Sequence, residues 1–246
     1  MAHLGGTSLF LSGDEVGFGR REDPADFARI LSQYVDVIVA RTFSHQTVLD
    51  LARDSQCPVI NGLSDEAHPC QALADLFTVQ EVCGDLKGRT LAFVGDGNNV
   101  ARSLAIGCAK LGMRFVLAAP QAYQLGSEFL DPLSRELPEA RIEQTTSPQK
   151  AVREAAIVYT DVWTSMGQES EREDRLEAFA AYQVNQSLMQ AAPSEARFLH
   201  CLPAHRSEEV TGAVLDGPQS VVLQQAANRM HLQKALLLWL LNEDAG

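Results

Sequence analysis

The alternation of short β-rich runs with amphipathic helical patterns is the feature that most constrains the fold of this chain. Strands are predicted at 35–40, 58–61, 90–95, 114–119, 156–162, 197–202 and 220–225. Helices are predicted between them, at 24–34, 45–55, 69–83, 99–111, 148–156, 185–192 and 207–215. Such alternation indicates βαβ crossovers and a mostly parallel sheet covered on both faces. The sequence therefore predicts an α/β fold with doubly wound parallel sheets.

A change of folding unit is predicted between residues 72 and 88. The predicted helix "QALADLFTVQEVCG" ends at Gly84, and "DLKGRT" then leads into a new strand. This places a first α/β domain at 1–80 and a larger domain at 85–225. A final helix, expected over 226–246, is apolar nearly all round, which predicts that it is buried and that it crosses back onto the first domain.

Composition excludes several classes of protein. The 246 residues are 46% hydrophobic, enough for a sizeable core, and carry a net charge of −12, which disfavours a general nucleic-acid binder. The C-terminal run "ALLLWLL" is too short to span a bilayer, and the first residues lack the basic region of a signal peptide. Five scattered cysteines without C-x-x-C spacing are typical of a reducing compartment. We therefore expect a soluble, cytoplasmic protein without a membrane or nucleic-acid partner.

Polar side chains stand at or just beyond the carboxyl ends of five predicted strands. They are Arg41, Asn61 with His68, Asp96 with Asn98 and Asn99, Asp161, and His200 with Cys201. Ligands of open α/β sheets bind beyond the carboxyl ends of the strands. The pattern therefore predicts that these groups line one crevice.

The segment "FVGDGNNVA" (93–101) is a strand, a glycine turn and the start of a helix. A nucleotide phosphate could bind at such a helix N-terminus. However, Val100 stands where the dinucleotide fingerprint has its third glycine, and the next strand lacks the acid that would hold a ribose. The pair Asn98 and Asn99 better suits a small polar ligand, although we interpret Asn98 chiefly as a helix cap. An NAD-dependent enzyme would show fluorescence quenching on addition of NADH, which we do not expect.

Two further motifs carry candidate binding groups. In "EAHPCQALAD" (66–75), His68 could donate to a carbonyl oxygen or an oxyanion, and Gln71 lies one turn further on. In "TDVWTSMGQE" (160–169), Asp161 could bind an ammonium group, with Trp163 and Met166 as an apolar wall. The structural alternatives are a capped surface helix for the first motif and an ordinary βα loop for the second.

The segment "FLHCLPAHR" (198–206) is chemically ambiguous. As a metal site, Cys201, His200 and His205 lack further clustered ligands. As a nucleophile, Cys201 would need a nearby base and an electropositive setting. A buried structural cysteine is the commonest alternative. Arg229, in an otherwise apolar helical pattern, could either pair structurally or direct its guanidinium into a cleft.

Taken together, these motifs resemble those of the ornithine carbamoyltransferase family. The strings "ARTFSH", "HPCQALAD", "FVGDGNN", "YTDVWTSMGQE", "HCLPAHR" and "ANR" stand in the family's order and spacing, over nearly the whole chain. "HPCQ" indicates only the wider aspartate and ornithine carbamoyltransferase family. The Ser-Met-Gly loop together with "HCLP" points to ornithine as the acceptor.

The resemblance implies a role for each matching residue. Arg41, His68 and Gln71 would hold carbamoyl phosphate, with His68 polarising the carbonyl. Ornithine would be bound through its α-amino and α-carboxylate groups by Asn99, Asp161, Ser165 and Met166. Cys201 and Leu202 would form the wall beside the reacting δ-amine and the carbamoyl group. Arg229 would face the carbamoyl group. The products would be citrulline and phosphate, no metal or organic cofactor would be needed, and the assembly would be a homotrimer or a multiple of one.

The sequence departs from the family pattern at one important place. Family members carry an S-T-R-T-R loop that cradles the phosphate, and this sequence contains no such string. We therefore expect a first domain that is incomplete and a chain that starts several dozen residues late. The main hypothesis is an ornithine carbamoyltransferase whose given chain is shortened. The alternative is a non-catalytic ornithine-binding or subunit-interaction protein that has lost the phosphate loop.

Overall fold

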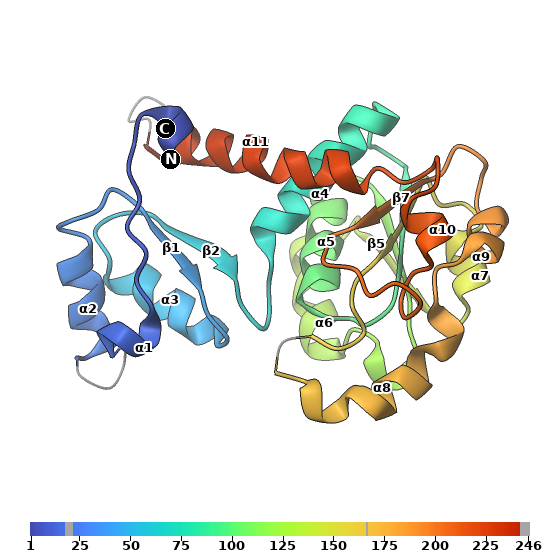
Figure 1. The fold of residues 1–246 in the computed structure, drawn as a ribbon, viewed down its shortest axis with the longest axis horizontal. Coiled ribbons are helices and arrows are strands. Elements are labelled where there is room, and N and C mark those ends of the chain that lie inside the picture. Colours follow the sequence, from blue (N-terminus) through green and yellow to red (C-terminus); the bar gives the residue numbers. More distant parts are fainter. Residues whose placement is uncertain (18–21, 166, 242–246) are drawn as a thin grey trace. The chain divides into compact units, whose positions relative to one another are not determined.

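The computed structural model describes residues 1–17, 22–165 and 167–241 (Figure 1). The chain forms two compact units, each considered by itself below. The first consists of Met1–Cys70 with Met230–Gly246, and the second of Gln71–Arg229. Among the described helices, none combines the length and the apolar character that crossing a membrane would require.

The first unit contains a small parallel sheet with short helices. Its elements up to Cys70 are a 3₁₀ turn at Ala2–Leu4, α1 (Gly13–Val16), α2 (Pro24–Leu31), β1 (Ile38–Arg41), α3 (His45–Asp54), β2 (Val59–Leu63) and the start of α4 (Pro69–Cys83). Strands β1 and β2 pair in parallel, with Ile38 opposite Val59. A small core of Ala28, Val48 and Leu51 joins the two helices α2 and α3 to the sheet.

The second unit is a doubly wound α/β structure. Its parallel sheet comprises β3 (Thr90–Val94), β4 (Arg114–Ala118), β5 (Arg141–Thr145), β6 (Ile157–Thr160) and β7 (Arg197–His200). The strand order is β5-β4-β3-β6-β7. Its helices are most of α4, α5 (Asn99–Lys110), α6 (Ser127–Glu136), α7 (Pro148–Val152), α8 (Arg172–Phe179), α9 (Gln186–Ala191), α10 (Gly212–Leu215) and the start of α11 (Val222–Leu241), whose residues from Met230 onward belong to the first unit. Short 3₁₀ turns lie at Gln121–Tyr123, Glu169–Glu171 and Ala180–Tyr182. The predicted α/β class with parallel sheets is confirmed.

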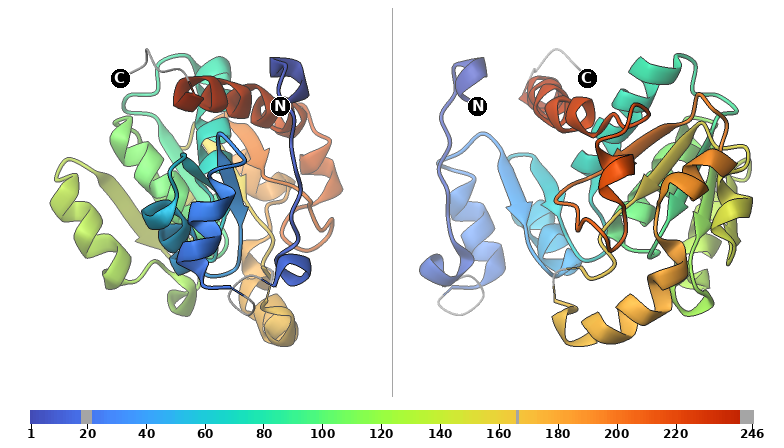
Figure 2. Two further views of the ribbon diagram at one scale, coloured as in Figure 1. Left: turned by 90° about the vertical axis from the view of Figure 1, so that its left-hand side faces the viewer. Right: turned by 45° about the vertical axis from the view of Figure 1, so that its right-hand side comes forward.

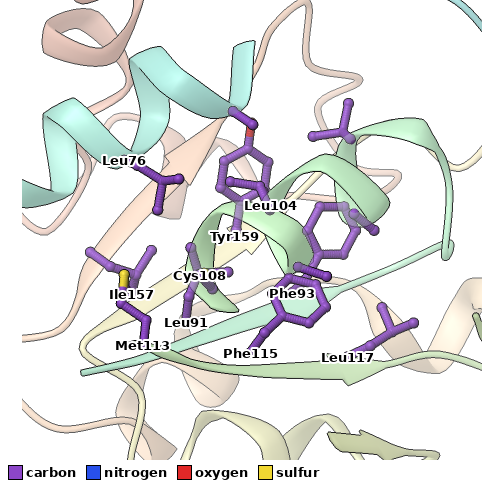
Figure 3. Packing of buried hydrophobic residues seen from close by; sticks show 14 of the residues in the cluster. Leu76, Leu91, Phe93, Leu104, Cys108, Met113, Phe115, Leu117, Ile157 and Tyr159 are labelled. Carbon is purple, nitrogen blue, oxygen red and sulfur yellow. The ribbon is translucent and has the colours of Figure 1, made fainter. Parts of the chain in front are cut away.

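Alternate residues of the central strands build two cores, one on each face of the sheet. On one face, Leu91 and Phe93 pack with α4 and α5 (Figure 3). On the other face, Ala92 and Val94 pack with α7, α9 and α10. Helix α8 lies beyond one end of the sheet in both views of Figure 2. Burial on both faces explains why β3 is an unbroken apolar run rather than an alternating one.

The strands differ from the sequence prediction in two places: one predicted strand is absent, and one strand was not predicted. The predicted strand at 220–225 is wrong, because α11 begins at Val222 and only Ser220 forms a bridge, to Phe198. A short apolar run does not distinguish a strand from a buried helical turn. Strand β5 was not predicted, because "RIEQT" is a polar, partly exposed edge strand without an apolar run.

The predicted burial of the last helix is also wrong. The helix begins four residues earlier than expected, and its buried side chains are Val222, Gln225 and Asn228, all in its first two turns. Leu238 and Trp239 are 56% and 63% exposed. The buried part is thus held largely by polar contacts, which an apolar pattern cannot reveal. Three other predicted helices are shorter than expected by three residues or more: 24–34 ends at Leu31, 148–156 ends at Val152, and 207–215 is helical only over Gly212–Leu215.

Candidate functional site

The carboxyl ends of β3 and β6 define the topological switch point of the second unit. From β3 the chain winds outward through β4 to β5, and β6 then returns to the opposite side of β3. Connections on the two sides therefore diverge, and the strand ends at such a point are where open α/β sheets bind their ligands. Asn98 follows β3, Asp161 follows β6 and Cys201 follows the adjacent strand β7.

Asp161 is the centre of this polar group and is 7% exposed. Its Oδ2 accepts a hydrogen bond from Asn98 Nδ2 at 2.8 Å, and its Oδ1 accepts from the Cys201 thiol at 2.8 Å. The backbone N–H of Val162 also donates to Oδ1. Of the groups predicted at the strand ends, the structure thus joins Asn98 and Cys201 to Asp161 by hydrogen bonds. The arrangement presents a largely buried carboxylate suited to a cationic ligand.

The environment of Cys201 disfavours covalent catalysis. Burial and the neighbouring Asp161 carboxylate raise the pKa of the Cys201 thiol well above its usual range. The nucleophilic form of cysteine is the thiolate, and these surroundings oppose its formation. The thiol is therefore a hydrogen-bond donor to Asp161 and not a nucleophile.

His200 is not available as a base for the Cys201 thiol, because both of its ring nitrogens are hydrogen-bonded to other groups. Its Nδ1 accepts the backbone N–H of Leu202 at 2.9 Å, so the ring proton lies on Nε2, which donates to Glu209 Oε1 at 3.0 Å. Asp161, His200 and Cys201 do place ligand atoms within 4.8 Å of one another. Both imidazole nitrogens are already engaged, however, and Asp161 and Cys201 alone offer fewer ligands than a zinc site uses.

The backbone of the turn "GDGNN" is closely packed against neighbouring protein atoms, and its Asn98 side chain binds the start of α5. A Cβ on Gly97 would lie 2.9 Å from the carbonyl oxygen of Tyr123, which explains the need for glycine there. Asn98 caps α5 as predicted, since its Oδ1 accepts from the backbone N–H groups of Val100 and Ala101. Two donors that a nucleotide phosphate would use are thus already satisfied. Asn99, the first residue of α5, is partly buried.

A buried ion pair holds the start of the loop that follows β6. Arg175 on α8 is 3% exposed and pairs with Asp96, while its Nε donates to the carbonyl oxygen of Trp163 at 2.5 Å. Its guanidinium also lies over the ring of Tyr123, 4.8 Å from the centroid. Burial raises the pKa of Asp96 and the Arg175 charge opposes that rise.

The same loop contains the predicted Ser-Met-Gly contacts. The backbone N–H of Ser165 donates to Gln168 Oε1 at 3.0 Å, and the Ser165 side chain is partly buried. Met166, predicted to contact ornithine, lies outside the described residues.

The remaining predicted residues lie on both units. In the first unit, Arg41 ends β1 and is exposed, and His68 is 6% exposed just before α4. In the second unit, Leu202 has a left-handed backbone with φ 57°, and Arg229 is half-buried on α11.

A buried cluster around Asp75 was not predicted. Asp75 and Tyr159 are fully buried, and Gln71 and Gln225 are each 1% exposed. Asp75 Oδ1 accepts from Gln71 Nε2 and from Gln225 Nε2, both at 2.7 Å, and Oδ2 accepts from the Tyr159 hydroxyl at 2.9 Å. The spacing of Gln71 and Asp75, four residues apart on one helix, was a signal in the sequence. Nothing in the sequence pointed to Tyr159 or Gln225.

A parallel α/β unit with a buried acid at its switch point defines a protein that binds a small polar molecule. The comparisons with known proteins make the assignment narrower. The model described as "Aspartate/ornithine carbamoyltransferase, carbamoyl-P binding domain" matches residues 1–81, and the model for the "Asp/Orn binding domain" of the same family matches residues 87–240. The chain belongs to the aspartate/ornithine carbamoyltransferase family.

Individual relatives agree with this assignment. The ornithine carbamoyltransferase of Bacillus subtilis is 52% identical over 239 residues, covering 96% of this chain and 75% of that protein. The structure of ornithine carbamoyltransferase from Pyrococcus furiosus superposes with a TM-score of 0.94 at 48% identity, covering 99% of this chain and 78% of that one. Anabolic ornithine carbamoyltransferase from Campylobacter jejuni gives a TM-score of 0.90 at 35% identity, covering 98% of this chain and 81% of that one.

Proposed function

We propose that this chain is an ornithine carbamoyltransferase, which transfers the carbamoyl group of carbamoyl phosphate to the δ-amine of L-ornithine. The observation that carries the proposal is the buried Asp161 carboxylate at the switch point, hydrogen-bonded to Asn98 and Cys201. A carboxylate in this position suits the α-ammonium group of an amino acid. The names of relatives at 52% identity support ornithine as that amino acid.

The proposed reaction forms one bond and breaks another. The neutral δ-amine attacks the carbamoyl carbon, an oxyanion develops on the carbonyl oxygen, and the bond between the carbamoyl carbon and the phosphate oxygen breaks. The proton of the attacking amine passes to the departing phosphate. We assign Arg41, His68 and Arg229 as donors to the developing charge, and Gln71 as a contact of the carbamoyl group. Most of the rate enhancement would come from orientation and from these donors.

On the ornithine side, Asn99, Asp161, Ser165 and Met166 are assigned to the α-amino and α-carboxylate groups. Cys201 and Leu202 are assigned to the wall beside the δ-amine and the carbamoyl group. The protonated thiol of Cys201 supports this wall role, because it is held as a donor by Asp161.

The phosphate end of the site is where this chain departs from the family pattern. The sequence contains no S-T-R-T-R string. Charge-assisted hydrogen bonds contribute about 1.5–3 kcal/mol each, so the loss of two would weaken binding about 10²- to 10⁴-fold.

Citrulline formation from ornithine and saturating carbamoyl phosphate tests the proposal, with ornithine binding measured in parallel by calorimetry. Turnover would support the proposed activity and show that other groups hold the phosphate. Ornithine binding without turnover would favour the non-catalytic binding protein. The absence of both ornithine binding and turnover would overturn the proposal.

We also propose a cytoplasmic homo-oligomer, a trimer or a multiple of one. Exposed aromatic side chains on the first unit support an assembly, since Tyr34 and Phe43 are 79% and 61% exposed. Light scattering would measure the mass directly, and a monomer at micromolar concentration would contradict the assignment.

A further inference from the structure

The side-chain amide of Gln71 has its nitrogen engaged by the protein and its oxygen unpaired among the described residues. Its Nε2 donates to Asp75 Oδ1 at 2.7 Å, one helical turn further along α4. Its Oε1 is buried and has no hydrogen-bond partner among the residues that the structure describes. An acceptor left unpaired in a buried position is costly unless a ligand satisfies it.

The orientation of the neighbouring amide is fixed by a backbone group. The backbone N–H of His200 donates to Gln225 Oε1 at 3.0 Å, and a backbone N–H can only donate. Gln225 must therefore turn its Nε2 the other way, toward Asp75 Oδ1 at 2.7 Å. The donor and acceptor of each hydrogen bond from the His200 backbone through Gln225 to Asp75 are therefore fixed.

An ionised Asp75 can only accept hydrogen bonds, and the three side chains that contact its carboxylate can all donate. Gln71 and Gln225 reach Oδ1, and the Tyr159 hydroxyl reaches Oδ2. If the Gln71 amide were flipped, its carbonyl oxygen would face the carboxylate, and two acceptors would oppose each other. The carboxylate thus selects one of the two amide orientations of Gln71.

We propose that Asp75 is a positioning residue that holds the Gln71 amide with Oε1 available as an acceptor for the N–H groups of the carbamoyl moiety. This inference rests on the proposed function, because it assigns the ligand of Gln71 as a carbamoyl group. The flipped amide would present a donor to a group that itself donates. Asp75 contacts no substrate in this scheme and acts through Gln71.

Protonation of Asp75 would remove this control. Burial raises the pKa of Asp75 to about 6, opposed by the three hydrogen bonds and by the charge of Arg229. The other titratable groups that interact electrostatically with it are Tyr159 and Cys201. A protonated Asp75 can donate to the Gln71 amide oxygen as well as accept from its amide nitrogen, so the selection of the Gln71 orientation is expected to fail below about pH 6.

The first test is a double-mutant cycle on Asp75 and Gln71. Asp75→Asn is expected to raise the KM for carbamoyl phosphate roughly tenfold, the effect of about one hydrogen bond, with less than about a threefold change in the KM for ornithine. In a Gln71→Ala background, Asp75→Asn should change the KM for carbamoyl phosphate no further. An equal effect of Asp75→Asn in both backgrounds would overturn the inference.

Thr78→Val is the matched control for damage to the helix packing. Thr78 is buried on α4 one turn from Asp75 and bonds to Asn228 at 3.0 Å, joining the same two helices without touching Gln71. It should leave the KM for carbamoyl phosphate unchanged. A tenfold rise in this control would show that loosened packing alone produces the effect, which would also overturn the inference.

The second test does not depend on activity. In protein labelled with ¹⁵N-glutamine, the side-chain amide of Gln71 is assigned by its loss in Gln71→Ala. We expect its signals to shift with pH around 6 in the wild type and to lose that dependence in Asp75→Asn. Unchanged Gln71 signals in Asp75→Asn would overturn the inference even if citrulline forms. If the wild type neither forms citrulline nor binds ornithine, the proposed function fails, and the amide signals still decide whether Asp75 orients Gln71.

Discussion

Asp96 and Arg175 form a buried ion pair that joins the end of β3 to helix α8 and, through the Trp163 carbonyl, to the loop after β6. The two residues are separated by 79 positions in the sequence. Arg175 also lies over the rings of Tyr123 and Phe179, so its charge is enclosed by aromatic faces as well as by the carboxylate. This pair ties the glycine turn to the proposed ornithine loop, and the hydrogen bond from Asn98 to Asp161 is a second tie between the same segments.

Arg175→Met is expected to lower the free energy of unfolding by about 3–5 kcal/mol, because it leaves the Asp96 carboxylate buried without its partner. Urea denaturation measures the change. Adding Asp96→Asn to Arg175→Met should recover part of the loss, since the buried charge is then removed.

Arg172→Met is the matched control, because Arg172 on the same helix pairs with Glu208 at a surface position with 49% of its side chain exposed. Its loss should cost no more than about 1 kcal/mol. Similar losses for Arg172→Met and Arg175→Met would contradict the importance given to burial.

Substitutions of Asp161 and His68 should affect different kinetic constants. Asp161→Asn is expected to raise the KM for ornithine about tenfold or more, because a neutral amide loses the charge that attracts an ammonium group. His68→Ala is expected chiefly to lower kcat, by about 10²-fold, the effect of removing one oxyanion donor. Steady-state kinetics with each substrate varied would separate the two. Equal effects on the KM for ornithine would refute the assignment.

Cys201 should be replaceable without loss of the chemistry. Cys201→Ser retains a donor to Asp161, so we expect kcat to fall by less than about tenfold, whereas removal of a covalent nucleophile would cost several orders of magnitude. The raised pKa of the Cys201 thiol also predicts slow reaction with iodoacetamide at neutral pH. Rapid inactivation by iodoacetamide, prevented by ornithine, would show a reactive thiolate at this position.

The sequence predicted those parts of the structure that depend on local pattern. β3 and β4 are apolar runs between turn signals, and the caps Asn98 and Ser147 stand where short polar side chains precede a helix. The secondary-structure predictions failed where contacts between residues distant in the sequence determine the structure. The first turn of α11 lies within the predicted strand 220–225, because its burial depends on Gln225 bonding to Asp75 of α4, which no local pattern displays.

The candidate site divides in the same way. Asp161 and Cys201 could be predicted because the carboxyl ends of parallel strands share one edge of the sheet. Arg175 could not, since a charged residue in the polar stretch "ESEREDRLEAF" gives no sign that it is 3% exposed. Its burial follows from Asp96, which lies far away in the sequence.

Asp75 should give the protein a distinctive pH dependence of stability. Burial raises the pKa of Asp75 from 3.8 to about 6 in the folded protein. Between about pH 4 and 6 the folded state therefore holds more of this proton than the unfolded state does. The contribution of Asp75 to the free energy of unfolding falls as pH rises through that window, by a total on the order of 3 kcal/mol.

Asp75→Asn removes the titrating group, so the difference in stability between the wild type and Asp75→Asn should shift in favour of the variant as pH rises from 4 to 7. Urea denaturation at several pH values measures this difference, in which contributions common to both proteins cancel. Thr78→Val changes the same helix contact without removing a titrating group, so its difference from the wild type should stay constant with pH. A constant difference for Asp75→Asn as well would mean that Asp75 has the same proton affinity in the folded and unfolded states, contrary to its complete burial.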